Sequence, residues 1–171
     1  MKRRRLLALL SLAPPGLSGC GFEPLYGRQA DTPITDAFAR IRIQPIANRS
    51  GQILRNHLYD RLQPRGEIGP IAYTLSVRLD EPLPQDLGIT RTDTVVRFSY
   101  SATADARLVD AAGREVWRGR SASSTNYEVS ASQFATLAGQ NNARERVLEE
   151  IANDIKAQLA AVLRARPPAP G

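Results

Sequence analysis

Few residues in this chain could take part in covalent or metal chemistry. Cys20 is the only cysteine and His57 the only histidine among the 171 residues. A nucleophilic triad would need His57 as its general base, but the surrounding pattern predicts a helix with this histidine at the boundary of its apolar face. A zinc site needs three or four Cys, His or acidic ligands, which these two residues cannot supply. We therefore predict a binding or structural protein that is not an enzyme and needs no metal or other cofactor.

Cys20 follows a segment with the properties of an export signal. A basic cluster at residues 2–5 precedes an apolar run at residues 6–13, and small residues stand directly before the cysteine. This order is typical of a secretory leader, and the Leu-Ser-Gly-Cys segment at residues 17–20 resembles the lipobox of bacterial lipoproteins. We predict that residues 1–19 are a signal peptide and that Cys20 is the acylated first residue of the mature chain. An ordinary cleaved signal with an incidental thiol is the alternative.

Lipidation of Cys20 would hold the mature chain on a membrane. The apolar run of the leader is too short to span a bilayer. Lipobox cysteines usually carry a diacylglyceryl group and an amide-linked acyl chain, and each buried methylene contributes about 0.8 kcal/mol to anchoring. Gly21 occupies the position at which an aspartate favours the inner membrane in enteric bacteria, so the residue type here favours the outer membrane.

The charge balance argues against a nucleic-acid partner. The formal net charge is +6, but four of the basic residues lie in the leader, so the mature chain is close to neutral. Lys156 is the only lysine after the leader, and the remaining cations are arginines. The planar guanidinium suits bidentate binding of phosphate and carboxylate, although a GC-rich genome also favours arginine over lysine.

Alternation of apolar and polar residues predicts four strands. They cover residues 41–46, 71–80, 96–108 and 116–127, with a hairpin turn between the last two. A helix follows the first strand, which we therefore expect to lie beside a later strand in parallel orientation. The connection after the second strand contains prolines and a glycine and is expected to be irregular.

Two segments have the spacing of amphipathic helices. The first runs to residue 62 with Ser50 as its N-cap. The second starts either near Ser132 or only after Gly139, and it ends near residue 164. The apolar stripe of the second helix consists of Phe134, Leu137, Val147, Leu148, Ile151, Ile155, Leu159 and Val162. We predict an α+β fold in the order β-α-β-β-β-α, a two-layer sandwich with two helices packed on one face of a four-stranded mixed sheet.

Three segments are expected outside this sandwich, which covers residues 40–164. Besides the leader, residues 20–39 lack sustained periodicity and are predicted to be an N-terminal tether. Residues 165–171 form a Pro/Ala tail that is predicted to be disordered.

One face of the predicted sheet is left without helices. It would expose Arg78, Arg97 and Arg107 among serines and threonines. Such a face is either the solvated side of an antiparallel sheet or a contact surface for a polar partner such as a barrel lumen. Both interpretations remain open at the level of the sequence.

The segment at residues 20–27, Cys-Gly-Phe-Glu-Pro-Leu-Tyr-Gly, resembles the start of the LptE family of lipopolysaccharide-assembly lipoproteins, and of its alphaproteobacterial members in particular. The element order and the final amphipathic helix with its Pro/Ala tail agree with this resemblance. It implies an outer-membrane lipoprotein on the periplasmic side that plugs the LptD β-barrel in a 1:1 complex. It further implies that the chain assists barrel assembly and binds lipopolysaccharide during transport to the outer leaflet, without catalysis or metal.

The resemblance also implies where lipopolysaccharide binds. In the family this binding is associated with basic residues near one end of the sheet, and Arg91 occupies the corresponding place here. Arg97, at the start of the following strand, is a second candidate, and either could hold a lipid A phosphate through charge-assisted hydrogen bonds. A further basic contact of the family falls near Gly139, where Arg144 is the nearest cation, so this chain departs from the pattern there. Plain solvation is the alternative for any single surface arginine.

Two other functions remain open on the sequence alone. A periplasmic adaptor lipoprotein that activates an envelope enzyme or an ABC transporter would also carry the lipid anchor. A lipid-anchored hydrolase would depend on His57.

Overall fold

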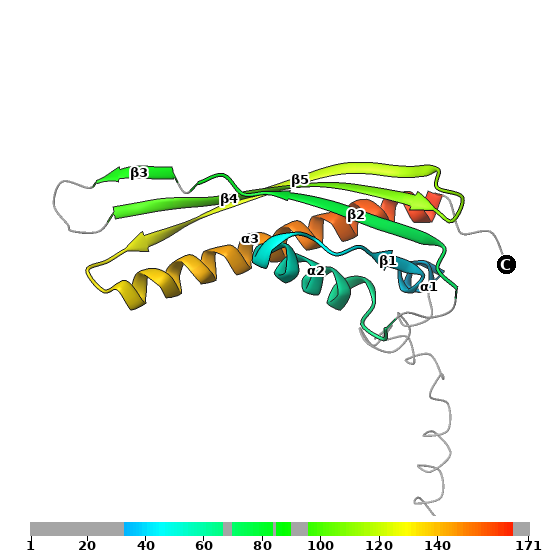
Figure 1. Cartoon of the computed structure of the whole chain (residues 1–171), viewed down its shortest axis with the longest axis horizontal. Coiled ribbons are helices and arrows are strands. Elements are labelled where there is room, and N and C mark those ends of the chain that lie inside the picture. The colour runs from blue at the N-terminus through cyan, green and yellow to red at the C-terminus, as the bar shows by residue number, and fades with distance from the viewer. Residues whose placement is uncertain (1–32, 67–69, 84, 90–95, 166–171) are drawn as a thin grey trace, which may run out of the picture. The chain divides into compact units, whose positions relative to one another are not determined.

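The computed structural model describes residues 33–66, 70–83, 85–89 and 96–165. Its elements are α1 (Pro33–Ala39), β1 (Ile41–Ile43), α2 (Asn48–Leu62), β2 (Tyr73–Asp80), β3 (Gln85–Ile89), β4 (Val96–Asp110), β5 (Glu115–Val129) and α3 (Gln133–Ala165) (Figure 1). The predicted α+β class and the order of its elements are confirmed, with α1 and β3 in addition. The predicted signal peptide, Cys20, Arg91 and the tail from residue 166 lie outside the described residues.

The sheet is mixed, as predicted. β1 runs parallel to β2, with Ile41 opposite Tyr73, and α2 forms the crossover that parallel neighbours require. β2 and β5 pair antiparallel with the two edges of β4. The strand order across the sheet is therefore β1, β2, β4 and β5.

β3 occupies a connection that was predicted to be irregular. It pairs with the first residues of β4, from Val96 to Ser99, whereas the β2 pairing begins at Thr103. β2 and β3 therefore pair with the same edge of β4, one after the other along its length. Pro82 lies between the two strands, which fits a break in the ladder because proline has no N–H to donate. The backbone groups of β4 beyond β2 still need partners, and β3 supplies them.

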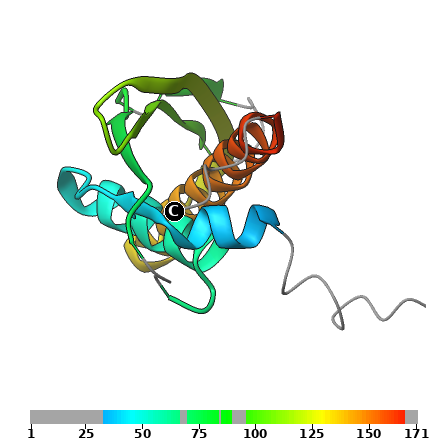
Figure 2. The same cartoon turned by 90° about the vertical axis from the view of Figure 1, so that its right-hand side faces the viewer.

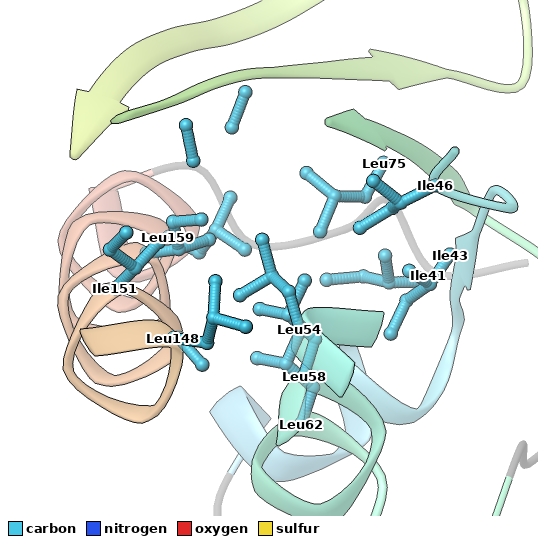
Figure 3. Close-up of a cluster of buried hydrophobic side chains, with 14 of the residues drawn as sticks. Ile41, Ile43, Ile46, Leu54, Leu58, Leu62, Leu75, Leu148, Ile151 and Leu159 are labelled. Carbon is cyan, nitrogen blue, oxygen red and sulfur yellow. The ribbon is translucent and has the colours of Figure 1, made fainter. Parts of the chain in front are cut away.

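The core lies between the sheet and the helices. α2 and α3 lie on the same side of the sheet (Figures 1 and 2). Leu54 and Leu58 of α2 meet Leu148 and Ile151 of α3, and all four side chains are fully buried (Figure 3). Burying an aliphatic side chain of this size contributes about 1.5–3 kcal/mol, so these contacts stabilise the pairing of the two helices.

The apolar residues predicted to be buried on α3 are buried in the middle of the helix but not at its two ends. Phe134 is 83% exposed and Leu137 is 58% exposed, whereas Leu163 is buried in place of Val162. The first turns of α3 extend past the start of α2 (Figure 1). These turns have the helical spacing of a core stripe but no facing helix to pack on.

The folded unit also begins earlier than predicted. Residues 33–39 form α1 and not the end of a tether, and Ala37, Phe38 and Ala39 are buried. The side-chain amide of Gln63 donates hydrogen bonds to the carbonyl oxygens of Phe38 and Ile41, which ties α1 to the end of α2. A helix of two turns is too short for periodicity to reveal.

Candidate functional site

The sheet face opposite the helices has the polar character that the sequence predicted. Its side chains on β2 and β4 are partly or fully exposed: Thr74, Ser76, Arg78, Arg97, Ser99, Ser101, Thr103 and Arg107. β5 adds Arg118 and Arg120, both exposed, which sequence reasoning missed because Gly119 and a run of serines obscure the alternation of this strand. Basic residues gather at the two ends of this face.

The first basic region lies at the start of β4. The side chain of Arg97 is 60% exposed, and its Nη2 lies 3.5 Å from Oε1 of Glu128 on β5. A recess of about 470 Å³ is lined by Arg97, Glu128, Gly139 and Arg146, among others. Arg146 comes from α3, so guanidinium groups from both layers border one recess. Helical periodicity assigned Arg146 to the exposed face and gave no further signal.

Arg144 does not belong to this recess. Its guanidinium carbon lies 5.6 Å from the centroid of the Tyr100 ring, and its Nε lies 4.0 Å from Oε1 of Glu81. The Tyr100 hydroxyl donates a hydrogen bond to the same Glu81 oxygen. With its side chain only 23% exposed, Arg144 is held by a polar cluster between the sheet and the helices and is not free to bind a large ligand.

Ser50 is not the N-cap that the sequence predicted. α2 begins at Asn48, two residues earlier, and Ser50 is buried in the first turn of the helix, beside this polar cluster. Burial raises the pKa of Tyr100 to about 12, and the hydrogen bond to Glu81 adds to the shift. The neutral phenol is therefore the form that the fold stabilises.

The second basic region lies at the other end of the face, next to the turn between β4 and β5. We call it the hairpin-end cluster; it contains Arg78, Arg107, Arg118, Arg120, Asp105 and Glu115. These residues lie on three neighbouring strands, and all except Glu115 line a shallow depression of about 640 Å³.

Two carboxylates hold three of the four guanidinium groups of the hairpin-end cluster. Arg120 contacts both carboxylate oxygens of Asp105, at 2.7 and 3.2 Å. Oε2 of Glu115 lies 2.6 Å from Nε of Arg107 and 2.9 Å from Nη2 of Arg118. Arg120 lowers the pKa of Asp105, and Arg118 lowers that of Glu115, so both acids are ionised at neutral pH. The cluster still carries an excess of positive charge.

His57 lies among polar side chains at the interface between α2 and α3. Its Nε2 is 2.9 Å from Oε1 of Glu145, and its Nδ1 is 3.3 Å from Nη1 of Arg61. Arg61 also donates to Glu149 of α3 at 2.8 Å. Among the described residues, the ring nitrogens of His57 make their polar contacts with Glu145 and Arg61, so this histidine helps to join the two helices.

In the described part of the chain, no group of three or more His, Cys, Asp or Glu side chains could hold a metal ion. The helices of this part are not apolar over a length that would cross a bilayer.

Comparison with known proteins identifies the family. The model of the LptE family, described as lipopolysaccharide-assembly, matches residues 38–159. This chain belongs to the LptE family. The match runs from the end of α1 to the last turns of α3 and includes both basic regions. It confirms the resemblance inferred from residues 20–27, which lie outside the matched range, and it gives the chain a role in lipopolysaccharide assembly.

Solved structures share the fold of this LptE-family chain. A putative lipoprotein from Caulobacter crescentus CB15 is 30% identical, with a TM-score of 0.68 over 81% of this chain and 100% of that chain. A minor lipoprotein from Acinetobacter baumannii is 14% identical, with a TM-score of 0.53 over 71% of this chain and 91% of that chain. The rare lipoprotein B from Shewanella oneidensis is 11% identical, with a TM-score of 0.54 over 73% of this chain and 96% of that chain. A search of curated protein sequences found no match.

Proposed function

We propose that this LptE-family chain is an outer-membrane lipoprotein that plugs the LptD β-barrel and binds lipopolysaccharide on its way to the outer leaflet. Cys20 carries the lipid anchor and holds the protein on the periplasmic side. The chain assists assembly of the barrel and acts by binding, without catalysis. The observation that carries this proposal is the LptE match over residues 38–159, which covers nearly all of the folded unit at residues 33–165.

The open sheet face supports a place inside a barrel. Its hydroxyl and guanidinium groups are exposed along β2, β4 and β5, and the interior wall of a large transmembrane barrel is also polar. A polar side chain that leaves water can form new hydrogen bonds with such a wall, so its desolvation is compensated. An apolar wall would leave these groups without partners.

The recess beside Arg97 supports lipopolysaccharide binding at the start of β4. We assign this binding to Arg91 and Arg97, and Arg146 extends the positive lining of the recess. Lipopolysaccharide carries phosphate groups, which guanidinium groups bind through charge-assisted hydrogen bonds.

Copurification tests the barrel assignment. The full chain is extracted with detergent from isolated outer membranes, and the proteins that remain bound are identified and quantified. We expect one large β-barrel protein in a one-to-one ratio with this chain. Recovery with a soluble or inner-membrane protein, and no barrel, would overturn the proposal in favour of the adaptor alternative.

Mass spectrometry of the native protein tests the anchor separately. We expect a chain that begins at Cys20 and carries a diacylglyceryl group and an amide-linked acyl chain. A bare thiol with residues 1–19 still attached would contradict both the anchor and the proposed location.

A further inference from the structure

The hairpin-end cluster brings like charges together at an energetic cost. Arg107 of β4 lies directly opposite Arg118 of β5, and their side chains leave the same face of the sheet. Like charges in directly opposed positions destabilise an antiparallel pair. Glu115 offsets part of this repulsion, because it contacts both guanidinium groups, but a single carboxylate cannot neutralise two of them.

Arg78 adds to this positive charge. It lies opposite Asp105 in the pairing of β2 with β4, but both oxygens of Asp105 already accept hydrogen bonds from Arg120. No ion pair with Arg78 is present among the described residues. The four guanidinium groups and Asp105 line one depression, and Glu115 contacts two of these guanidinium groups. The six side chains of the cluster therefore carry two uncompensated positive charges.

We propose that the hairpin-end cluster is a second anion-binding site, which takes a phosphate group of a phosphorylated glycolipid headgroup. Guanidinium groups bind phosphate through paired, charge-assisted hydrogen bonds. The volume of about 640 Å³ lies within the range of sites that hold small-molecule ligands. The side chains of Arg118 and Arg120 are 69% and 70% exposed, so the site is open to a headgroup whose acyl chains lie elsewhere.

This site is distinct from the recess at Arg97. Arg97 and Arg107 lie on the same strand, and at the rise of an extended chain they are separated by roughly 30 Å. The two basic regions therefore mark opposite ends of the open sheet face, next to the start and the end of β4 (Figure 1). The inference rests on the proposed function, because it gives the lipopolysaccharide carried by this chain a second point of contact.

The test compares variants of the full chain in detergent. Arg107→Gln with Arg118→Gln removes the opposed pair of charges. Arg49→Gln with Arg164→Gln removes the same charge from exposed positions on α2 and α3. Arg107→Lys with Arg118→Lys keeps the charge but loses the planar fork. Binding of intact and of enzymatically dephosphorylated lipopolysaccharide is measured for each, and thermal unfolding confirms that each variant is folded.

We expect the glutamine pair at positions 107 and 118 to weaken binding of intact lipopolysaccharide by about tenfold. The lysine pair should show a smaller loss, and the control pair should match the wild type. The difference between the glutamine pair and the wild type should disappear with the dephosphorylated ligand.

Three results would overturn the inference. If the glutamine pair binds intact lipopolysaccharide as tightly as the control pair, the cluster does not bind the headgroup, and the proposed function is unaffected. If this variant binds lipopolysaccharide normally but no longer copurifies with the barrel, the cluster contacts an acidic protein surface instead. If the wild-type chain itself fails to bind lipopolysaccharide, the ligand-binding part of the proposed function fails as well.

Discussion

Nε of Arg107 lies 2.6 Å from Oε2 of Glu115 across the β4–β5 pair, although strict alternation would turn Glu115 toward the helices. Trp117 lies opposite the buried Leu108, so a residue two positions earlier on a regular strand would share its inward direction. The register shifts between Leu108 and Val109, and Glu115 pairs with Val109 on the outer face. This is a β-bulge, which redirects a side chain by adding one residue to one strand.

The carboxylate placed by the bulge competes with any bound anion. Glu115→Gln should therefore strengthen binding of intact lipopolysaccharide by about threefold to tenfold, because Arg107 and Arg118 lose their internal partner. Binding is measured as for the variants above, with Asp60→Asn, an exposed position on α2, as a control of equal charge change. A loss of affinity on Glu115→Gln would mean that the carboxylate orients the cluster and does not compete.

Gly119 is required for the packing of β5 against α3. A Cβ at this position would overlap the Trp117 ring and Oε1 of Gln158, whose amide donates to the carbonyl oxygen of Arg120 at 3.2 Å. Gly119→Ala should lower the free energy of unfolding by about 1–3 kcal/mol. Denaturant unfolding measures this effect.

Gly139→Ala is the matched control for this substitution. A Cβ there would lie 3.6 Å from the nearest atom, which is ordinary contact, and alanine is favoured over glycine in a helix by about 1 kcal/mol. We expect the free energy of unfolding to rise. If both alanine variants were destabilised alike, steric overlap at position 119 would not be the cause.

The shifted pKa of Tyr100 predicts a loss of stability in alkali. The pKa of Tyr100 in the folded chain is about 12, against a usual value of 10.0, so its contribution to the free energy of unfolding is fully present below pH 10. Above pH 10 the Tyr100 hydroxyl ionises in the unfolded chain but stays neutral in the folded chain. This contribution is therefore lost progressively as the pH rises toward 12. Unfolding curves of the wild type and Tyr100→Phe, measured across this interval, should converge as the pH rises. A constant difference between the two would contradict the assignment.

The exposed start of α3 can be distinguished from its buried middle. Leu148→Ala should lower the free energy of unfolding by about 2–5 kcal/mol, because its side chain is fully buried and its loss leaves a cavity. Phe134→Ser should change it by less than about 0.5 kcal/mol. Thermal unfolding of the two variants measures this difference, and strong destabilisation by Phe134→Ser would show that the side chain is covered in solution.

The first lipopolysaccharide site is tested by Arg91→Gln with Arg97→Gln. We expect binding of lipopolysaccharide to weaken by about tenfold, because charge-assisted contacts to phosphate are lost. The control is again Arg49→Gln with Arg164→Gln. Equal losses in both double variants would mean that net charge alone sets the affinity.

The sequence predicted most of the fold because long elements carry strong periodicity. The alternation in β2 and β4 placed Arg78, Arg97 and Arg107 correctly on the outer face. The short elements α1 and β3 were missed, because seven and five residues give too few repeats to establish a period. β3 forms mainly because β4 needs a partner along its edge, and that need is visible only once the strands are paired.

The site was less predictable than the fold. Cross-strand register decides which arginines meet, and a single bulge brings Glu115 to Arg118, three positions away on the same strand. The residues around Glu115 and Arg118 show no pattern from which this contact could be predicted. The partners of Arg144 could not be predicted, since Glu81 and Tyr100 come from distant parts of the chain.

The position of α3 at the end of the described chain bears on the order of folding. It supplies Val147, Leu148, Ile151, Ile155 and Leu159 to the core, and no earlier element can replace them. A chain that emerges N-terminus first, from a ribosome or a translocation channel, therefore leaves the part of its inner sheet face that α3 covers exposed until the final helix is free. Synthesis and passage through a narrow pore can be completed before a stable globule exists to obstruct them.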